Sequence, residues 1–235
     1  MARRGTVRMS QKERLQGTIF FVFYLLFFPL LFPKVLQLLE LLLNLQLSAA
    51  AENAIYYYLI FALTLLIFYR YLWQNCQHCF DHLGRTLSTA GIGLICFYGG
   101  NELIYRLSHL LLGSRINLND VSIAAQINTA PRMTAFLVIV LAPFVEEVLF
   151  RGLVFGCLRE RSRLLAYLLS ALLFALLHVL RFFLSGFDPG YLVLMLQYLV
   201  PGLIFAWAAE HSGNLWGAIL LHMMVNALSV WVMLN

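Results

Sequence analysis

Charged side chains are scarce in this sequence. Only 11% of its 235 residues are charged and 62% are hydrophobic, with a mean hydropathy of +0.82. A soluble domain needs a charged surface, and charged residues usually make up about a quarter of it. The apolar/polar alternation of a transmembrane barrel strand is also missing. These two absences exclude a soluble domain and an outer-membrane barrel.

Paired cysteines are missing as well. The four cysteines, Cys76, Cys79, Cys96 and Cys157, form no disulfide pattern. Cys76 and Cys79 make one C-x-x-C with His78 and His82 nearby, but a structural zinc site of this type usually has a second cysteine pair. We therefore interpret this stretch as a solvated, reduced loop in preference to a metal or redox site.

The apolar residues are gathered into long runs that contain almost no charge. Several of these runs approach the ~20 residues that a helix needs to cross a hydrocarbon core. Backbone groups in lipid must be paired internally, so each run is expected to be a helix. The sequence predicts an all-α, polytopic membrane helix bundle with about seven to eight transmembrane helices. The runs cover residues 19–32, 55–68, 135–145, 164–177, 191–209 and 215–234.

The formal charge of +5 could indicate binding to nucleic acid, but the positions of the basic residues argue against it. Five of them precede the first apolar run, and three more lie between two later runs. Such clusters follow the positive-inside rule and contact anionic headgroups. We expect a multi-pass protein of the cell membrane with a cytoplasmic N-terminus and membrane lipids as partners. The clusters are Arg3, Arg4, Arg8, Lys12 and Arg14, and then Arg159, Arg161 and Arg163.

The predicted organisation has two parts within one integral membrane domain. Residues 1–132 are expected to hold N-terminal helices and connecting segments, and residues 133–235 a catalytic core of four helices. Within the first part we expect an interfacial helix at 35–47, a polar loop at 74–86 and a polar connection at about 106–132. The expected spans are 17–32, 54–73, 86–104, 133–158, 164–184, 191–209 and 215–234.

The predicted helix at 133–158 contains three charges where none is expected. Charges inside a membrane are expensive, rare and usually functional. Glu147 and Arg151 are four residues apart and share one helix face, so they can form an ion pair. Glu146 is rotated from Glu147 by about 100° and is paired less directly. A partly desolvated carboxylate without a full partner can exchange protons with a substrate.

Three more polar groups lie in the later apolar runs. His178 stands alone in one run, and His222 and Asn226 are four apart in the last. A single buried His or Asn is more often a helix–helix hydrogen bond than a catalyst, and one Glu–Arg pair alone is as easily structural. Two Glu, two His and one Asn on three helices favour function for the set.

Together these residues resemble the CPBP family of intramembrane endopeptidases, which includes the type II CAAX prenyl endopeptidases and the bacterial Abi or bacteriocin-processing proteins. The resemblance covers about residues 133–235, and the earlier helices match only as generic membrane helices. The three patterns read Glu146-Glu147-x-x-x-Arg151, Phe174-x-x-x-His178 and His222-x-x-x-Asn226.

The resemblance implies an intramembrane protease in which Glu146 and His178 activate a water molecule. His222 and Asn226 would donate hydrogen bonds to the oxyanion, and Glu147 with Arg151 would orient the site. The substrate would be a membrane-associated protein or peptide, with or without a lipid group, and no cofactor is expected.

Two other interpretations of these residues stay open. Two His and a Glu can also bind catalytic zinc, although the His-Glu-x-x-His spacing is absent. A non-catalytic immunity or assembly partner on the same scaffold is the main functional alternative. A proton-coupled transporter is disfavoured, because the chain shows no duplicated halves.

Overall fold

The computed structural model describes residues 7–113, 117–186 and 188–235, and within these ranges the chain forms helices and no strand. Arg3 and Arg4 of the basic cluster lie outside them. The elements are α1 (Gln11–Val22), η1 (Phe23–Phe27), α2 (Phe28–Leu30), α3 (Phe32–Leu43), α4 (Ala49–Asp81), α5 (Leu83–Leu112), α6 (Leu118–Thr129), α7 (Pro131–Phe136), η2 (Leu137–Leu141), α8 (Ala142–Glu147), η3 (Val148–Phe155), α9 (Gly156–Arg159), α10 (Arg163–Ser185), α11 (Gly190–Ser212) and α12 (Trp216–Leu234), where η marks π-helical segments.

Six helices of the described chain are long and apolar enough to cross a membrane. This confirms a polytopic all-α bundle. The predicted count of seven to eight spans is not confirmed, because α5, expected as a span, is long but is not among the six. The six candidate spans are Gln11–Leu30, Ala49–Asp81, Pro131–Arg159, Arg163–Leu180, Gly190–Ser212 and Trp216–Leu234.

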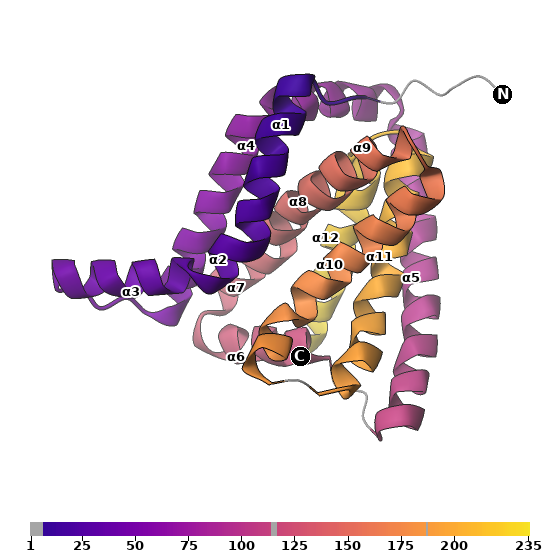
Figure 1. Cartoon of the computed structure of the whole chain (residues 1–235). Coiled ribbons are helices and arrows are strands. Elements are labelled where there is room, and N and C mark those ends of the chain that lie inside the picture. The colour runs from indigo at the N-terminus through magenta and orange to yellow at the C-terminus, as the bar shows by residue number, and fades with distance from the viewer. Residues whose placement is uncertain (1–6, 114–116, 187) are drawn as a thin grey trace.

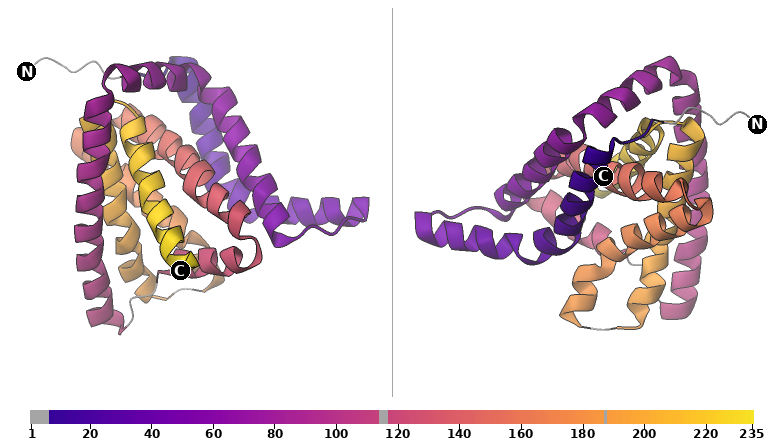
Figure 2. Two further views of the ribbon diagram at one scale, coloured as in Figure 1. Left: turned by 180° about the vertical axis from the view of Figure 1, so that it is seen from behind. Right: turned by 45° about the horizontal axis from the view of Figure 1, so that its top comes forward.

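The long helix from α7 to α9 runs through the middle of the bundle (Figure 1). The helices α1 and the first part of α4 cover one side of it, and α5 packs against α11 and α12 at the opposite edge (Figures 1 and 2). One buried apolar cluster reaches from Met9 and Phe68 to Phe150 and Val225. The N-terminal helices therefore share a core with the four C-terminal spans.

The prediction of a polar loop at 74–86 is wrong, because most of this stretch is helical. Helix α4 bends at Phe68, which has non-helical backbone angles (φ −108°, ψ 16°), and then continues to Asp81. The Thr64 hydroxyl donates to the Ile60 carbonyl at 2.7 Å, a side-chain bond that often accompanies helix bending. Beyond the bend, α4 crosses the end of the bundle and leads directly into α5 (Figure 1). Cys76 and Cys79 thus lie on a helix.

The polar connection expected at 106–132 is also largely helical. Helix α5 continues to Leu112, and α6 occupies Leu118–Thr129. Asn117 caps α6, because its side-chain oxygen accepts the backbone N–H groups of Asn119 and Asp120. Polar residues in this stretch therefore mark a helix cap and not an irregular segment.

The helix α3 projects sideways from the bundle (Figure 2). Pro33 follows the first expected span, 17–32, and occupies the first turn of α3. A proline is tolerated there because the N–H it lacks has no helical partner. Leu41, Leu42 and Leu43 are exposed on α3. The placement of this helix in the membrane interface stays a prediction, as does the cytoplasmic N-terminus.

The central helix contains two π-helical segments, one on each side of α8. The segment η2 ends where the N–H of Ala142 bonds to the carbonyl of Leu137, and Pro143 follows in the first turn of α8. The segment η3 carries Arg151. Such wide turns are rare and are frequently found at functional sites. They set the direction in which Glu146 and Arg151 leave the helix.

Gly202 lets α10 and α11 approach closely. A Cβ atom at this position would lie 2.9 Å from the Cα of Ala171, so the two backbones would have to separate. We expect Gly202→Ala to lower the free energy of unfolding by about 1–3 kcal/mol. Gly99→Ala is the matched control, since a Cβ there meets nothing within 4 Å; it should be neutral or slightly stabilising. Thermal unfolding in detergent compares the two, and equal melting temperatures would contradict the packing argument.

Candidate functional site

The predicted ion pair between Glu147 and Arg151 is present and completely buried. Arg151 Nη1 lies 2.9 Å from Glu147 Oε1, and both side chains are 0% exposed. The guanidinium also lies over the ring of Phe174, 4.3 Å from its centroid, and Nη2 donates to the Gly202 carbonyl at 3.2 Å. Stacking and hydrogen bonding together compensate the cost of burying a cation. The pair fixes the end of α8 against α10 and α11.

The same carboxylate oxygen contacts His222. The Nδ1 atom of His222 lies 2.8 Å from Glu147 Oε1, and its ring stacks on Phe205 with centroids 4.4 Å apart. Since the ionised carboxylate only accepts hydrogen bonds, Nδ1 carries a proton in this arrangement. Glu147 therefore orients His222 and leaves its Nε2 atom for other contacts.

His178 is oriented by the backbone of its own helix. Its Nδ1 lies 2.8 Å from the Phe174 carbonyl, which can only accept, so this nitrogen is protonated. In the neutral ring, Nε2 then carries a lone pair. The ring stacks on Tyr198 with centroids 4.6 Å apart. His178 is therefore held as a proton acceptor through Nε2.

Glu146 is partly buried, and one of its oxygens is buried without a protein partner. Among the described residues, its Oε2 atom has no hydrogen-bond partner. Glu147 Oε2 shares this condition, but Glu147 is already engaged through Oε1. Glu146 thus differs from its neighbour: it is the carboxylate available to a ligand.

Asn226 joins the last span to the first π segment of the central helix. Its Nδ2 donates to the Val138 carbonyl at 2.9 Å. This bond uses one amide hydrogen and leaves the second. Nothing in the spacing His222-x-x-x-Asn226 indicated the contact with Val138, which lies 88 residues away in sequence.

A cavity of about 690 Å³ brings the expected residues together. Glu146, His178, His222 and Asn226 all line it, while Glu147 and Arg151 lie behind its wall. A volume of this size is typical of a ligand pocket. The arrangement offers two proton acceptors, Glu146 and His178 Nε2, together with an amide donor. This is the chemistry needed to activate a water molecule.

The structure adds wall residues that the sequence interpretation missed. Tyr56 and Tyr57, within the span expected at 54–73, line the cavity. So do Asn101 and Gln197, which are single amides in long helices. Isolated amides in apolar helices are the signal that could have identified them, by the same argument that identified Asn226.

Asp120 lines the same cavity from α6, outside the six candidate spans. Burial raises the pKa of its carboxyl from the ordinary 3.8 to about 6. Because the folded-state pKa exceeds the unfolded one, the ionised group destabilises the fold above about pH 6. We expect Asp120→Asn to raise the free energy of unfolding at pH 7.5 by on the order of 1–3 kcal/mol.

The gain from Asp120→Asn should shrink as the pH falls through 6 and vanish near pH 4, where Asp120 is protonated in both states. Thermal unfolding of the two proteins in detergent at pH 7.5 and pH 5 measures this. A difference that is the same at both values would show that the charge of Asp120 is not responsible.

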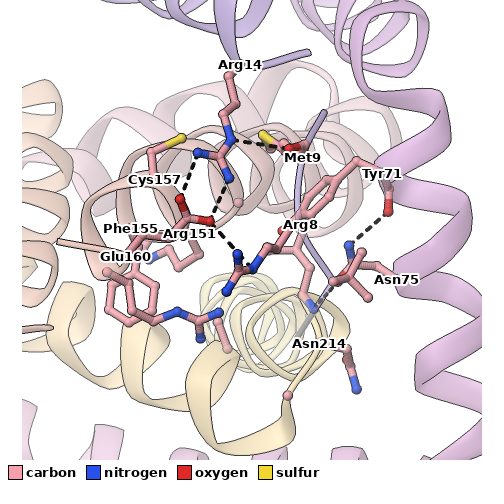
Figure 3. Close-up of a pocket in the computed structure, with 17 residues that line it drawn as sticks. Arg8, Met9, Arg14, Tyr71, Asn75, Arg151, Phe155, Cys157, Glu160 and Asn214 are labelled. Atoms are coloured by element: carbon pink, nitrogen blue, oxygen red, sulfur yellow. Dashed lines mark hydrogen bonds and ion pairs between the residues drawn. The ribbon is translucent and has the colours of Figure 1, made fainter. Parts of the chain in front are cut away.

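The N-terminal segment is clamped to the far end of the central helix (Figure 3). Arg14 makes a bidentate pair with Glu160, at 2.9 and 2.7 Å, and Arg8 lies 3.6 Å from the same carboxylate. The hydrogen bonds from Arg14 lower the pKa of Glu160. A small pocket of about 40 Å³ lies beside this clamp, and Arg151 lines it. The buried ion pair therefore lies between this pocket and the large cavity.

The cysteine and histidine cluster shows no metal-binding arrangement. All four cysteines are free, and Cys79 is buried on α4. His78 and His82 stack with centroids 4.4 Å apart. Across the part of the chain that the structure describes, no three His, Cys, Asp or Glu side chains are grouped to hold a metal ion.

Comparison with known proteins points to membrane peptidases. The family model for type II CAAX prenyl endopeptidase Rce1-like proteins matches residues 128–228. A Bacillus subtilis (strain 168) protein named "Putative membrane peptidase YdiL" is 26% identical over 157 residues, which are 66% of this chain and 59% of the relative. The chain therefore matches less than two thirds of that relative's length. No solved structure gives a significant match.

Proposed function

We propose that this chain, whose residues 128–228 match the family model for type II CAAX prenyl endopeptidase Rce1-like proteins, is a membrane peptidase that hydrolyses peptide bonds with a water molecule activated by Glu146. The observation that carries the proposal is the meeting of Glu146, His178, His222 and Asn226 in the wall of one cavity. The substrate we propose is a membrane-associated protein or peptide, with or without a lipid group.

The nucleophile would be a water molecule held by two acceptors. Glu146 has an oxygen without a protein partner, and His178 presents the lone pair of Nε2. A water molecule can donate one hydrogen to each. As its oxygen attacks the substrate carbonyl carbon, Glu146 takes up the proton and then returns it to the leaving nitrogen. The products are a carboxylic acid and an amine, and no covalent enzyme intermediate forms.

The negative charge that develops on the substrate carbonyl oxygen during the attack must be stabilised by hydrogen-bond donors. The second amide hydrogen of Asn226 is one, since the first is held by Val138. His222 can donate through Nε2 only when both ring nitrogens are protonated, because Nδ1–H already binds Glu147. Preorganised donors of this kind often contribute several kcal/mol to the rate. Glu147 and Arg151 are thus positioning residues for His222.

The proposal is tested with the purified protein in detergent and a library of labelled peptides. We expect cleavage that is unaffected by the chelator 1,10-phenanthroline, because glutamate and histidine activate the water. A zinc enzyme would be silenced by the chelator and restored by added metal. Mass spectrometry of the products measures both outcomes. Metal-dependent recovery would overturn the glutamate mechanism, and an absence of cleavage across the library would favour the non-catalytic partner.

A further inference from the structure

Two amide side chains in the cavity wall have carbonyl oxygens without hydrogen-bond partners. Asn101 on α5 is 8% exposed and Gln197 on α11 is 3% exposed. Within the described chain, neither Asn101 Oδ1 nor Gln197 Oε1 has a partner. The Nε2 of Gln197 lies 3.4 Å from the Ser108 hydroxyl, which orients the amide. A buried acceptor left unpaired destabilises a fold, so such a group in a native protein indicates a ligand or water.

Both amides belong to residues in the wall of the cavity that holds the proposed catalytic residues. Asn101 and Gln197 line it together with Glu146 and His178. Helices α5 and α11 are packed against each other. They lie across the bundle from the first part of α4 (Figures 1 and 2). Tyr56 of α4 also lines the cavity. The lining of the cavity therefore extends from α4 to α5 and α11, and the two amides belong to the part formed by α5 and α11.

The lining specifies the chemistry of that ligand. Its charged members are the acids Glu102, Asp120 and Glu146, and no lysine or arginine is among the described lining residues. Phosphate and carboxylate groups are disfavoured beside these acids, whereas N–H donors are needed by the unpaired oxygens. An extended peptide presents one backbone N–H per residue, at a rise of about 3.3 Å. Its main chain supplies the missing donors whatever its side chains are.

We propose that Asn101 and Gln197 bind the main chain of the substrate, by accepting hydrogen bonds from its backbone N–H groups. This rests on the proposed peptidase function and adds to it a site that is separate from the reacting atoms. The two amides select an extended peptide segment, and they leave the side chains of that segment to the rest of the cavity.

The variants that test this remove one acceptor while keeping its volume. Gln197→Met and Asn101→Leu should each lower kcat/KM roughly 3- to 10-fold, chiefly through a higher KM, because a neutral hydrogen bond to the substrate is lost. Asn101→Leu should melt at or above the wild-type temperature, since an unpaired buried acceptor has been removed. In Gln197→Met the same gain is offset by the loss of the contact with the Ser108 hydroxyl. A purely structural amide would change the melting temperature without changing KM.

Thr89→Val is the matched control. Thr89 lies on α5, is 1% exposed and has an unpaired hydroxyl oxygen within the described chain, but it does not line the cavity. It should alter thermal stability and leave KM unchanged. If it raised KM as much as Gln197→Met does, the effect would belong to helix packing and the proposal would fail.

Peptides with single N-methylated bonds identify the contact directly. With the best peptide of the cleavage library, methylation at one position should weaken wild-type binding and have little further effect on Gln197→Met. Equal losses in both proteins at every position would contradict the assignment.

A binding measurement separates this proposal from the proposed function. A fluorescein-labelled pool of randomised decapeptides is titrated against the Glu146→Gln protein, and anisotropy is measured. Only contacts common to all peptides survive averaging over the pool, so binding should fall several-fold with Gln197→Met added. Binding that falls in this way while wild type cleaves nothing would reject catalysis alone. Cleavage that is unaffected by Gln197→Met would reject the main-chain site alone.

Discussion

Glu146→Gln is expected to lower kcat by about 10²–10⁴-fold while the protein remains folded. The glutamine side chain has the shape of glutamate but cannot accept the proton of the attacking water. Glu146 has a buried oxygen without a protein partner among the described residues, so the substitution disrupts no recorded hydrogen bond there. Turnover of the best library peptide and thermal unfolding in detergent are the two measurements.

Glu160→Gln provides the control for this substitution. Glu160 pairs with Arg14 at the far end of the central helix, away from the large cavity. The same change of carboxylate to amide there should leave kcat within about twofold, because no step of hydrolysis uses that group. Retention of most turnover by Glu146→Gln at normal protein levels would make us abandon Glu146 as the base. A non-catalytic partner would keep its cellular effect in that variant.

Arg151→Ala is expected to lower the free energy of unfolding by about 3–5 kcal/mol, because it leaves Glu147 buried without its cationic partner. Both side chains are 0% exposed, and the guanidinium also holds the Gly202 carbonyl. Activity should fall as well, since His222 is oriented by the same carboxylate. Thermal or denaturant unfolding in detergent measures the loss.

Arg106→Ala is the control for Arg151→Ala, because it breaks an ion pair with the same four-residue spacing at an exposed position. Arg106 and Glu102 are also four residues apart and 2.7 Å from each other, but their side chains are 69% and 49% exposed. An exposed pair of this kind usually contributes about 0.5 kcal/mol or less. Equal destabilisation by the two substitutions would show that burial is not the cause.

A double substitution separates the contribution of the ion pair to protein stability from its role in positioning His222. Replacing both partners, with Glu147→Leu and Arg151→Met, removes the uncompensated charge and should restore most of the stability. It also removes the acceptor of His222 Nδ1, so turnover should stay low. Restored turnover in the double variant would show that Glu147 does not position His222.

The four C-terminal spans were predicted to within a few residues. Their apolar runs are interrupted by groups that end or start helices, such as Ser162, whose side chain accepts the Leu165 N–H at the start of α10. The residues of the candidate site could also be selected from the sequence, because polar groups stand out in apolar helices. Their contacts could not: His222 and Glu147 are 75 residues apart.

The end of α4 was missed because its polar residues were interpreted as solvated. Asn75 is 2% exposed, and its side-chain oxygen accepts the Leu215 N–H at 2.9 Å. Asn214 donates to the Thr86 hydroxyl at 2.9 Å. A helix whose polar side chains form hydrogen bonds to other helices has the same amino-acid composition as a solvated loop. Only the three-dimensional arrangement distinguishes the two. Asn101 and Gln197 were missed because neither belongs to a spaced motif, although each is an isolated amide in a long helix.

The length of the central helix can change at the π-helical segment η3. A π turn contains one residue more than an α turn, so Val148–Phe155 could lose one residue and still form a continuous helix. The wide turn would then become an α turn, and the side chains beyond it would keep their direction relative to those before it. A loss between Glu147 and Arg151 would shorten their separation to three residues, and their contact would have to form again at that spacing. Residue identity alone is therefore insufficient to compare this site between proteins; the number of residues separating the two must be compared as well.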